Sequence, residues 1–241
     1  MKEIRIFQVK IGDEEQLATK NIVKGTKTPK EKIVLVNDEE FLEWNPYNSK
    51  LAAAIRNGLQ ILPIIKNSKI ICINPLEEST ILHISNIVGS RGIVFVIDDN
   101  KNKKSFLKKL ADTHKNIIPI YDNLHELSHS SSITGKGDAL YVDIPESDQM
   151  EMIIENCGSF LKNEGFLMLI AKKDNNAILE NDVVGWIAEQ RAGLNKIREI
   201  TNKLRSQFEI IQEINLGLNY TMKKSYHKLY VFILLQYLQK N

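Results

Sequence analysis

The chain has 241 residues, of which 43% are apolar, and a formal net charge of +2. This apolar fraction can fill the core of one large domain, which excludes disordered and fibrous classes, and the two cysteines lack the C-x-x-C spacing of a disulfide scaffold or metal site. No apolar run marks export or approaches the roughly 20 residues of a membrane span, so we expect a cytoplasmic protein.

Residues 1–44 predict a small β subdomain. Short alternating apolar runs occur at 3–7 and 32–36, and a glycine-containing turn follows the first of them at 12–13. Alternation of apolar and polar residues is typical of strands that bury one face. We therefore place a domain boundary after residue 44 and expect residues 45–241 to form the main domain.

The main domain is predicted to be a doubly wound α/β domain. A helix is expected to begin near Ser49, because Leu51 and Ile55 recur at four-residue spacing and Asn48 or Ser49 can cap the free amides. Beyond it, short apolar runs alternate with helical stretches, which is typical of a mostly parallel, Rossmann-like sheet buried on both faces. The predicted strands are 69–73, 93–97, 116–121, 139–142, 166–170, 208–214 and 229–234, and the predicted helices are 80–88, 101–113, 147–162 and 182–205.

A ligand crevice is expected beyond the carboxyl ends of the strands, where open α/β sheets bind their ligands. Nucleotide-binding members carry glycines in the first loop and, about 20 residues later, an acid that holds the ribose. Asp98 can serve as that acid, although an acid that simply faces water explains it equally well. The first loop, Asn74–Thr80, has no glycine, and Ser79 or Thr80 can be explained as helix caps. The segments predicted to rim the crevice are 74–80, 98–99, 122–124 and 143–146.

The segment Trp44–Ile55, with sequence WNPYNSKLAAAI, resembles the fibrillarin pattern WNPFRSKLAAAI. Other segments that resemble this family are Thr19–Val23 (TKNLV in the family), His83–Gly89 (HVSDIVG), 116–120 and 143–149 (DVAQPDQ). The resemblance runs from about residue 17 to residue 235. It implies a methyltransferase fold and a role in box C/D ribonucleoproteins, in which fibrillarin is the RNA 2′-O-methyltransferase. It also implies a Nop-domain scaffold protein as partner, which carries the box C/D guide RNA together with a kink-turn-binding protein.

The catalytic set of the family is a lysine, an aspartate, a second lysine and a histidine. The resemblance places these at Lys50, Asp143, Lys172 and His227. Such groups can hold a ribose hydroxyl, remove its proton and align it with a methyl sulfonium. Taken singly, each has a simpler explanation, because lysines at strand ends are usually solvated and His227 can be an edge residue. The spacing from Tyr220 to His227 is also longer than the PYxxDH pattern of the family.

The cofactor segments depart from the family pattern. The GAASGTT loop becomes Asn74–Thr80, the EF pair becomes Asp98-Asp99, and the DA pair becomes Asn123-Leu124. The cofactor-binding positions that the resemblance implies are Ser79, Thr80, Asp98, Asp99, Asn123, Leu124, Asp143, Ile144, Pro145 and Glu146.

These replacements are expected to weaken S-adenosylmethionine binding. Pro75 and Leu76 add bulk where the cofactor would lie. A carboxylate about 6 Å from that of the cofactor costs roughly 2–3 kcal/mol at an effective dielectric of about 20. Alternatively, Glu77 and Glu78 point outward and stabilise their helix as acids of its first turn.

Two hypotheses about function remain, with a third disfavoured. The first is a fibrillarin-like protein of box C/D ribonucleoproteins that acts in rRNA and tRNA 2′-O-methylation and processing as a cofactor-deficient, non-catalytic subunit. The alternative is an active S-adenosylmethionine-dependent RNA 2′-O-methyltransferase. An unrelated nucleotide-binding enzyme is disfavoured by the extent of the resemblance.

Overall fold

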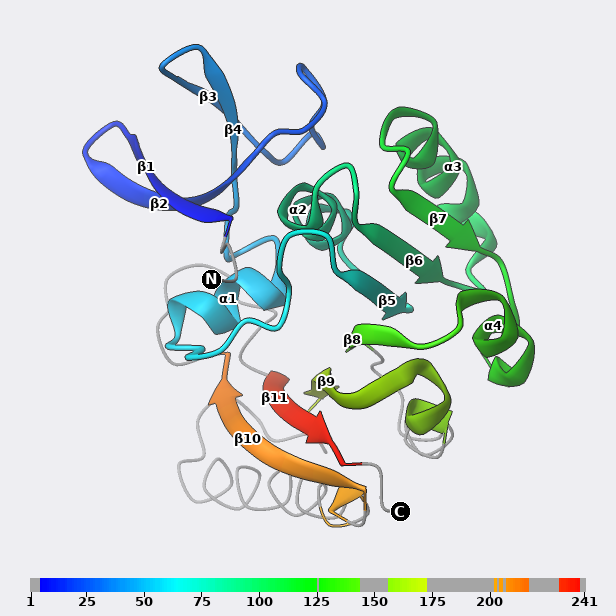
Figure 1. The fold of residues 1–241 in the computed structure, drawn as a ribbon. Helices are drawn as coiled ribbons and strands as arrows, with labels where there is room; N and C mark the ends of the chain where they lie inside the picture. Colours follow the sequence, from blue (N-terminus) through cyan, green and yellow to red (C-terminus); the bar gives the residue numbers. More distant parts are fainter. Residues whose placement is uncertain are drawn as a thin grey trace, which may run out of the picture.

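The described residues form two β-sheets, and helices pack against the larger one (Figure 1). The structure, a computed structural model, describes residues 5–124, 126–143, 156–172, 202, 204–205, 207–216 and 230–238. The small sheet is formed by the blue segments of Figure 1, and the large sheet runs from the green strand β7 to the orange strand β10.

The small sheet consists of four antiparallel strands in the order β1-β2-β4-β3. Their bounds are β1 Ile6–Ile11, β2 Glu14–Lys20, β3 Ile33–Val36 and β4 Glu39–Glu43. Asn37 and Asp38 join β3 to β4, both at positive φ (50° and 63°), which is the two-residue hairpin geometry that Asn and Asp tolerate. All four strands lie within the segment whose alternating pattern predicted strands.

The large sheet has seven strands in the order β10-β11-β9-β8-β5-β6-β7. Its bounds are β5 Lys69–Ile73, β6 Ile93–Ile97, β7 Ile117–Ile120, β8 Gly137–Asp143, β9 Leu161–Lys172, β10 Phe208–Asn215 and β11 Tyr230–Tyr237. The strands from β9 to β7 pair in parallel, while β11 pairs antiparallel with β9 and β10. This mostly parallel sheet confirms the predicted α/β class.

The helices whose full length is described are α1 Lys50–Arg56, α2 Glu78–Val88, α3 Lys104–Thr113, which follows the 3-10 turn η1 Lys101–Lys103, and α4 Leu127–Thr134. Ser49 caps α1 as predicted, since its hydroxyl accepts a hydrogen bond from Ala52 N at 3.2 Å. The sequence did not predict α4, because its run LSHSSSIT is rich in serine, which favours turns over helix interiors.

Two predictions about elements were wrong. Ser79 and Thr80 do not cap α2, because the helix begins at Glu78 and both residues lie inside it. Strand β9 begins at Leu161, before the predicted residue 166, and the helix expected there ends by residue 160. Most of the helix predicted at 182–205 lies outside the described residues.

The core lies on both faces of the large sheet. Along β5, Ile70 and Cys72 pack on the face covered by α1 and α2, whereas Ile71 and Ile73 pack on the opposite face. A strand buried on both sides needs apolar residues at every position, which explains the unbroken apolar run. Within the part of the chain that the structure describes, no helix has the length and apolarity needed to cross a membrane.

The small sheet is fixed to α2 by buried polar contacts. His83 of α2 stacks on Trp44 with ring centroids 4.7 Å apart, and its Nδ1 lies 2.8 Å from Thr19 Oγ1. Asn86 Nδ2 donates to the same hydroxyl at 3.0 Å. Burial lowers the pKa of His83, so the ring is neutral near pH 7. The small sheet thus sits over the helix that begins at the crevice.

Candidate functional site

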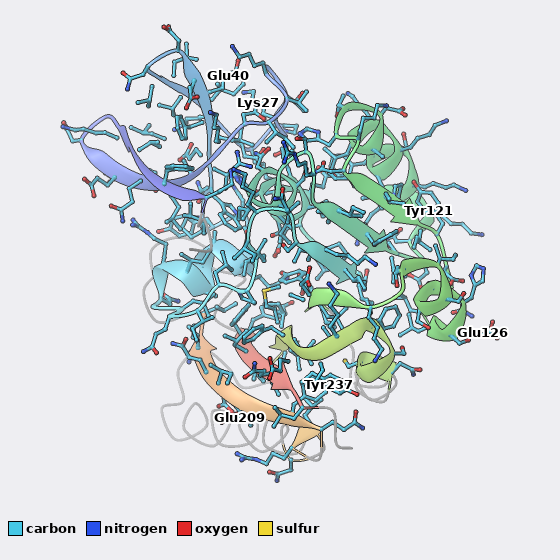
Figure 2. All side chains as sticks on the ribbon, in the orientation of Figure 1. Lys27, Glu40, Tyr121, Glu126, Glu209 and Tyr237 are labelled. Carbon is cyan, nitrogen blue, oxygen red and sulfur yellow. The ribbon has the colours of Figure 1, made fainter. Side chains whose placement is uncertain are left out.

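The predicted crevice maps to the carboxyl ends of β5, β6, β7 and β8. The chain builds β5, β6 and β7 outward in one direction and then returns to add β8 on the other side of β5. Such a reversal of strand order opens a ligand crevice above the sheet. The segments that were predicted to rim the crevice each follow one of these four strands, as far as the structure describes them. Tyr121, which directly follows β7, is labelled in Figure 2. The fold therefore brings them to one edge, as predicted.

A buried cluster of three charges occupies the β8 side of this crevice. Lys50 is the first residue of α1, and its Nζ lies 2.9 Å from Asp143 Oδ2 and 2.8 Å from Glu77 Oε1. The Lys50 ammonium also lies 4.6 Å from the centre of the Tyr230 ring. Lys50 is 3% exposed and Asp143 is 0% exposed, so both charges are held away from water. The structure thus joins Lys50 and Asp143, which are far apart in sequence.

The cluster holds one ammonium between two carboxylates. Burial raises the pKa of the Asp143 carboxyl to about 6, and the charge of Glu77 adds to the rise while that of Lys50 opposes it. Burial alone lowers the pKa of Lys50, but the two carboxylates outweigh it and the pKa rises. Lys50 therefore stays charged, whereas Asp143 exchanges its proton near neutral pH.

The loop that connects β5 to α2 folds without glycine. Asn74 takes a left-handed φ of 47°, which asparagine tolerates better than most residues. Glu77 turns inward to Lys50, and its Oε2 accepts a hydrogen bond from Thr80 Oγ1 at 3.3 Å. Glu78 is exposed in the first turn of α2. The expectation of outward-pointing acids is therefore right for Glu78 and wrong for Glu77.

A second ion pair occupies the β6 side of the crevice. Lys103 Nζ lies 2.7 Å from Asp98 Oδ2, and the other oxygen, Oδ1, accepts a hydrogen bond from Asn100 N at 2.8 Å. Lys103 Nζ also donates to Pro75 O at 3.1 Å and to Asn74 Oδ1 at 3.3 Å. Asp98 is 1% exposed. The lysine therefore ties the acid predicted to hold a ribose to the loop predicted to hold a methyl donor.

Five of the other implied cofactor positions differ in their surroundings. Asp99 and Asn123 are exposed, whereas Leu124 is fully buried among the apolar residues at the end of β7. The Ser79 side chain is buried, and its hydroxyl has no hydrogen-bond partner among the described residues. Thr80 lies beside α1, and its hydroxyl is hydrogen-bonded to that of Ser49 at 2.7 Å.

Some predicted positions have no described side chain. Lys172 is the last residue of β9, and its backbone pairs with that of Tyr230. Ile170, two residues earlier in β9, pairs with Asp143 of the neighbouring strand β8. The backbone of Lys172 therefore lies at the same edge of the sheet as Asp143. His227 and the segment 144–146 lie outside the described residues.

Three contributors to the site were not predicted from the sequence: Glu77 as a partner of Lys50, Tyr230 beside the same ammonium, and Lys103. Lys103 sits in a lysine-rich stretch that reads as a solvated helix face. The available signal was its position in the turn that follows Asp98, close enough along the chain for an ammonium to reach the carboxylate.

The fibrillarin family model matches residues 1–226. The chain belongs to the fibrillarin family. It is 38% identical over 175 residues to a fibrillarin-like rRNA/tRNA 2′-O-methyltransferase of Methanocaldococcus jannaschii, covering 71% of this chain and 76% of that protein.

Solved fibrillarin structures share the whole architecture. The Methanococcus jannaschii fibrillarin pre-rRNA processing protein superposes with a TM-score of 0.79 at 29% identity, over 100% of both chains. Aeropyrum pernix fibrillarin with natively bound S-adenosyl-L-methionine gives 0.75 at 23% identity, over 98% of this chain and 100% of that one. The fibrillarin of a fibrillarin/Nop5p complex gives 0.74 at 22% identity, over 98% of each chain. Because their sequence identities are only 23% and 22%, the last two structures show a likeness of fold alone.

Proposed function

We propose that this member of the fibrillarin family acts as a subunit of a box C/D ribonucleoprotein, in the 2′-O-methylation and processing of rRNA or tRNA, and that it binds S-adenosylmethionine weakly or not at all. Family membership supports the first part. The contact between Lys103 and Asp98 carries the second part, because it uses the acid that a cofactor ribose would need.

Binding of a cofactor ribose at Asp98 would replace this ion pair with hydrogen bonds from the ribose hydroxyls. Removing one partner of a fully buried ion pair costs about 3–5 kcal/mol, which is an upper limit for this pair because the Lys103 side chain is 19% exposed. Two ribose hydroxyls that donate to the freed carboxylate return about 1.5–3 kcal/mol each. Loss of the ion pair would therefore offset part of the affinity that Asp98 contributes while Lys103 holds it. A conventional ribose acid would contribute its hydrogen bonds without that loss.

Glu77 acts against the cofactor in a second way. Its carboxylate lies at the start of α2, where an open α/β sheet binds the anionic part of its ligand. A ligand carboxylate about 6 Å away would be opposed by roughly 2–3 kcal/mol at an effective dielectric of about 20, partly offset by Lys50. Of the two bulky replacements in this loop, Leu76 is 37% exposed and Pro75 is buried, so Pro75 is the one that can reduce the space. The residues present thus fit S-adenosylmethionine poorly.

The proposed partner is a Nop-domain scaffold protein, through which the protein would meet the box C/D guide RNA and the kink-turn-binding protein. The support is the family match over residues 1–226, which includes the small sheet and α1 as well as the crevice. A fibrillarin of the same fold is found in a complex with Nop5p. Loss of cofactor affinity would not disturb these surfaces.

An active RNA 2′-O-methyltransferase is the alternative, and the intact Lys50–Asp143 pair favours it. A carboxyl with a pKa of about 6 suits the removal of a proton near neutral pH. The Lys50 ammonium can orient the carboxylate and hold a ribose oxygen beside it. In that case Asp143 would take the hydroxyl proton as the oxygen attacks the methyl group of the donor.

Reconstituted particles distinguish the two functions. The protein would be assembled with a Nop-domain scaffold, a kink-turn-binding protein and a guide RNA, and methyl transfer from a labelled donor would be measured. The matched particle would carry Asn74→Gly, Pro75→Ala, Glu77→Ser and Glu78→Gly, which restore the small, uncharged loop.

We expect co-purification of both forms with the scaffold at moderate salt and stronger methylation by the restored form. Strong methylation by the original form would support the alternative. Failure of the original form to bind the scaffold would overturn the proposed partnership.

A further inference from the structure

Lysines line the exposed side of α3. Residues 101–115 contain six lysines and one acid, Asp112. Lys101, Lys104 and Lys108 follow one another at spacings of three and four residues, so they lie on one side of the helical segment formed by η1 and α3. All three residues are exposed. We call these three residues the lysine row.

No acid of the described chain neutralises the lysine row. The side chains of Lys101 and Lys108 form no hydrogen bond or ion pair among the described residues, and Asp112 forms no ion pair there either. Lys104 Nζ lies 4.9 Å from the centre of the Tyr121 ring, which is an uncharged partner. The row therefore presents an excess of positive charge to the solvent.

Helix stability alone does not account for the lysine row. The first turn of α3 has no acidic residue, and its N-cap residue, Lys103, makes no side-chain cap hydrogen bond. The helix dipole opposes cations at the amino-terminal end. Like charges four residues apart on a helix, such as Lys104 and Lys108, also repel each other. A bound anion would relieve both of these unfavourable effects.

An exposed aromatic side chain borders the lysine row. Tyr121 directly follows β7 and is 40% exposed, and it is labelled in Figure 2. Its hydroxyl donates to Lys104 O at 3.1 Å, which holds the ring against the start of α3. The surface thus offers cations for phosphates and an exposed ring on which a base can stack. Proteins that bind single-stranded nucleic acid combine these two features.

This surface is separate from the Lys50–Asp143 cluster. Strands β5 and β6 lie between β8, which ends at Asp143, and β7, which leads to Tyr121. Neighbouring strands are about 4.8 Å apart, so β7 lies roughly 14 Å from β8. A ligand held by the lysine row would therefore use residues that the cluster does not.

We propose that the lysine row and Tyr121 bind single-stranded RNA. Phosphate oxygens accept hydrogen bonds from the ammonium groups, and a base stacks on the Tyr121 ring. The choice of RNA over DNA rests on the proposed function. The contact follows the backbone and one base plane, so it carries little sequence preference.

Other anionic partners fit this surface less well. Protein interfaces are enriched in arginine and depleted in lysine, whereas residues 101–121 contain no arginine. An anionic membrane would need apolar side chains that can insert, but Leu107 and Leu110 of α3 are buried in the core.

The test uses the full chain and a short fluorescein-labelled single-stranded RNA without self-complementarity. Fluorescence anisotropy would give the affinity between about 50 and 200 mM salt. Lys101→Glu with Lys108→Glu reverses two exposed charges of the lysine row. The control, Lys10→Glu with Lys136→Glu, makes the same change in net charge at exposed lysines outside α3. Because no scaffold, guide RNA or methyl donor is present, the result is independent of the particle assay that tests the proposed function.

We expect the reversals in the lysine row to weaken RNA binding by about tenfold or more and to lower the salt slope by about 1.4, since each phosphate contact with a single strand contributes about 0.7. The control should change the affinity by less than about threefold, because distant charges are screened. Equal losses from both double variants would overturn the proposal, because binding would then follow the net charge alone.

Tyr121 provides a second measurement. Tyr121→Leu removes the ring and should weaken RNA binding by about fivefold or more, whereas Tyr121→Phe keeps the ring and should bind within about twofold of the original. Equal affinities of these two variants would contradict the stacking contact. Unlabelled RNA should also compete about tenfold better than poly-glutamate of matched charge, because poly-glutamate has no bases to stack. Equal competition by poly-glutamate would overturn the proposal in favour of an acidic protein partner.

Discussion

The ammonium of Lys103 lies 2.7 Å from the carboxylate of Asp98, the acid that the sequence predicts for a cofactor ribose. The carboxylate is almost fully buried, and the ammonium also contacts the loop that follows β5. On the other side of the crevice, Glu77 contacts Lys50 in the same manner. Both contacts pair an acid at the carboxyl end of the sheet with a lysine of the protein.

The first prediction concerns the dependence of stability on pH. Burial raises the pKa of Asp143 from 3.8 to about 6, so the folded state binds more protons than the unfolded state between these values. The stabilising contribution is complete below pH about 3.8 and is lost as the pH rises through about 6. The change is on the order of 3 kcal/mol. Asp143→Asn should abolish it, as measured by urea unfolding at several pH values.

Asp138 provides the control for this experiment. Lys162 Nζ lies 2.6 Å from Asp138 Oδ1, and although partial burial opposes it, hydrogen bonds and nearby lysines lower the pKa of Asp138. Its contribution therefore has the opposite sign and is lost as the pH falls. If Asp138→Asn and Asp143→Asn changed the pH profile in the same direction, the account of Asp143 would be wrong.

The second prediction concerns the buried cluster. Lys50→Met leaves Asp143 and Glu77 without their shared cation, and removal of one partner of a buried pair costs about 3–5 kcal/mol. Glu77→Gln should lower the pKa of Asp143, because the Glu77 charge contributes to its rise. Urea unfolding and NMR titration of the Asp143 carboxyl are the measurements.

Glu78→Gln is the matched substitution, since Glu78 is exposed in the first turn of α2. It should change the free energy of unfolding by no more than about 0.5 kcal/mol. Equal pKa shifts of Asp143 in the Glu77 and Glu78 variants would show that Glu77 points elsewhere.

The third prediction concerns the attachment of the small sheet. Thr19→Val keeps the shape of the side chain but removes the hydroxyl that contacts His83 Nδ1 and Asn86 Nδ2. Buried groups left without partners are unfavourable by about 1–3 kcal/mol in general. Thermal unfolding should show that loss, whereas Ser132→Ala on the exposed face of α4 should be nearly neutral. An unchanged melting temperature for Thr19→Val would contradict the contact.

The sequence predicted the parts of this structure that depend on local pattern. Continuous apolar runs correctly predicted the bounds of β5 and β6, because strands buried on both faces need apolar residues throughout. The serine-rich run of α4 carries no such pattern, and tertiary packing of Leu127 makes it helical. Predictions from pattern therefore hold where burial is uniform.

The edge of the sheet that carries the candidate site was predictable from the sequence, but most of its contacts were not, and the roles of its residues remain predictions. Lys50 and Asp143 meet as the resemblance implied. Nothing in the sequence said whether Glu77 or Glu78 would turn inward, since both sit at the start of the same helix. The pairing of Lys103 depends on how its turn folds against Asp98, which the lysine-rich pattern does not encode.

The most direct test of the proposed cofactor deficiency is calorimetric titration of S-adenosylmethionine into the original protein and into Lys103→Ala. Lys101→Ala, an exposed lysine of the same turn, is the control. We predict weak or undetectable binding to the original and control proteins and an affinity about tenfold higher for Lys103→Ala, because Asp98 becomes available. Tight binding by the original protein that Lys103→Ala leaves unchanged would contradict the account.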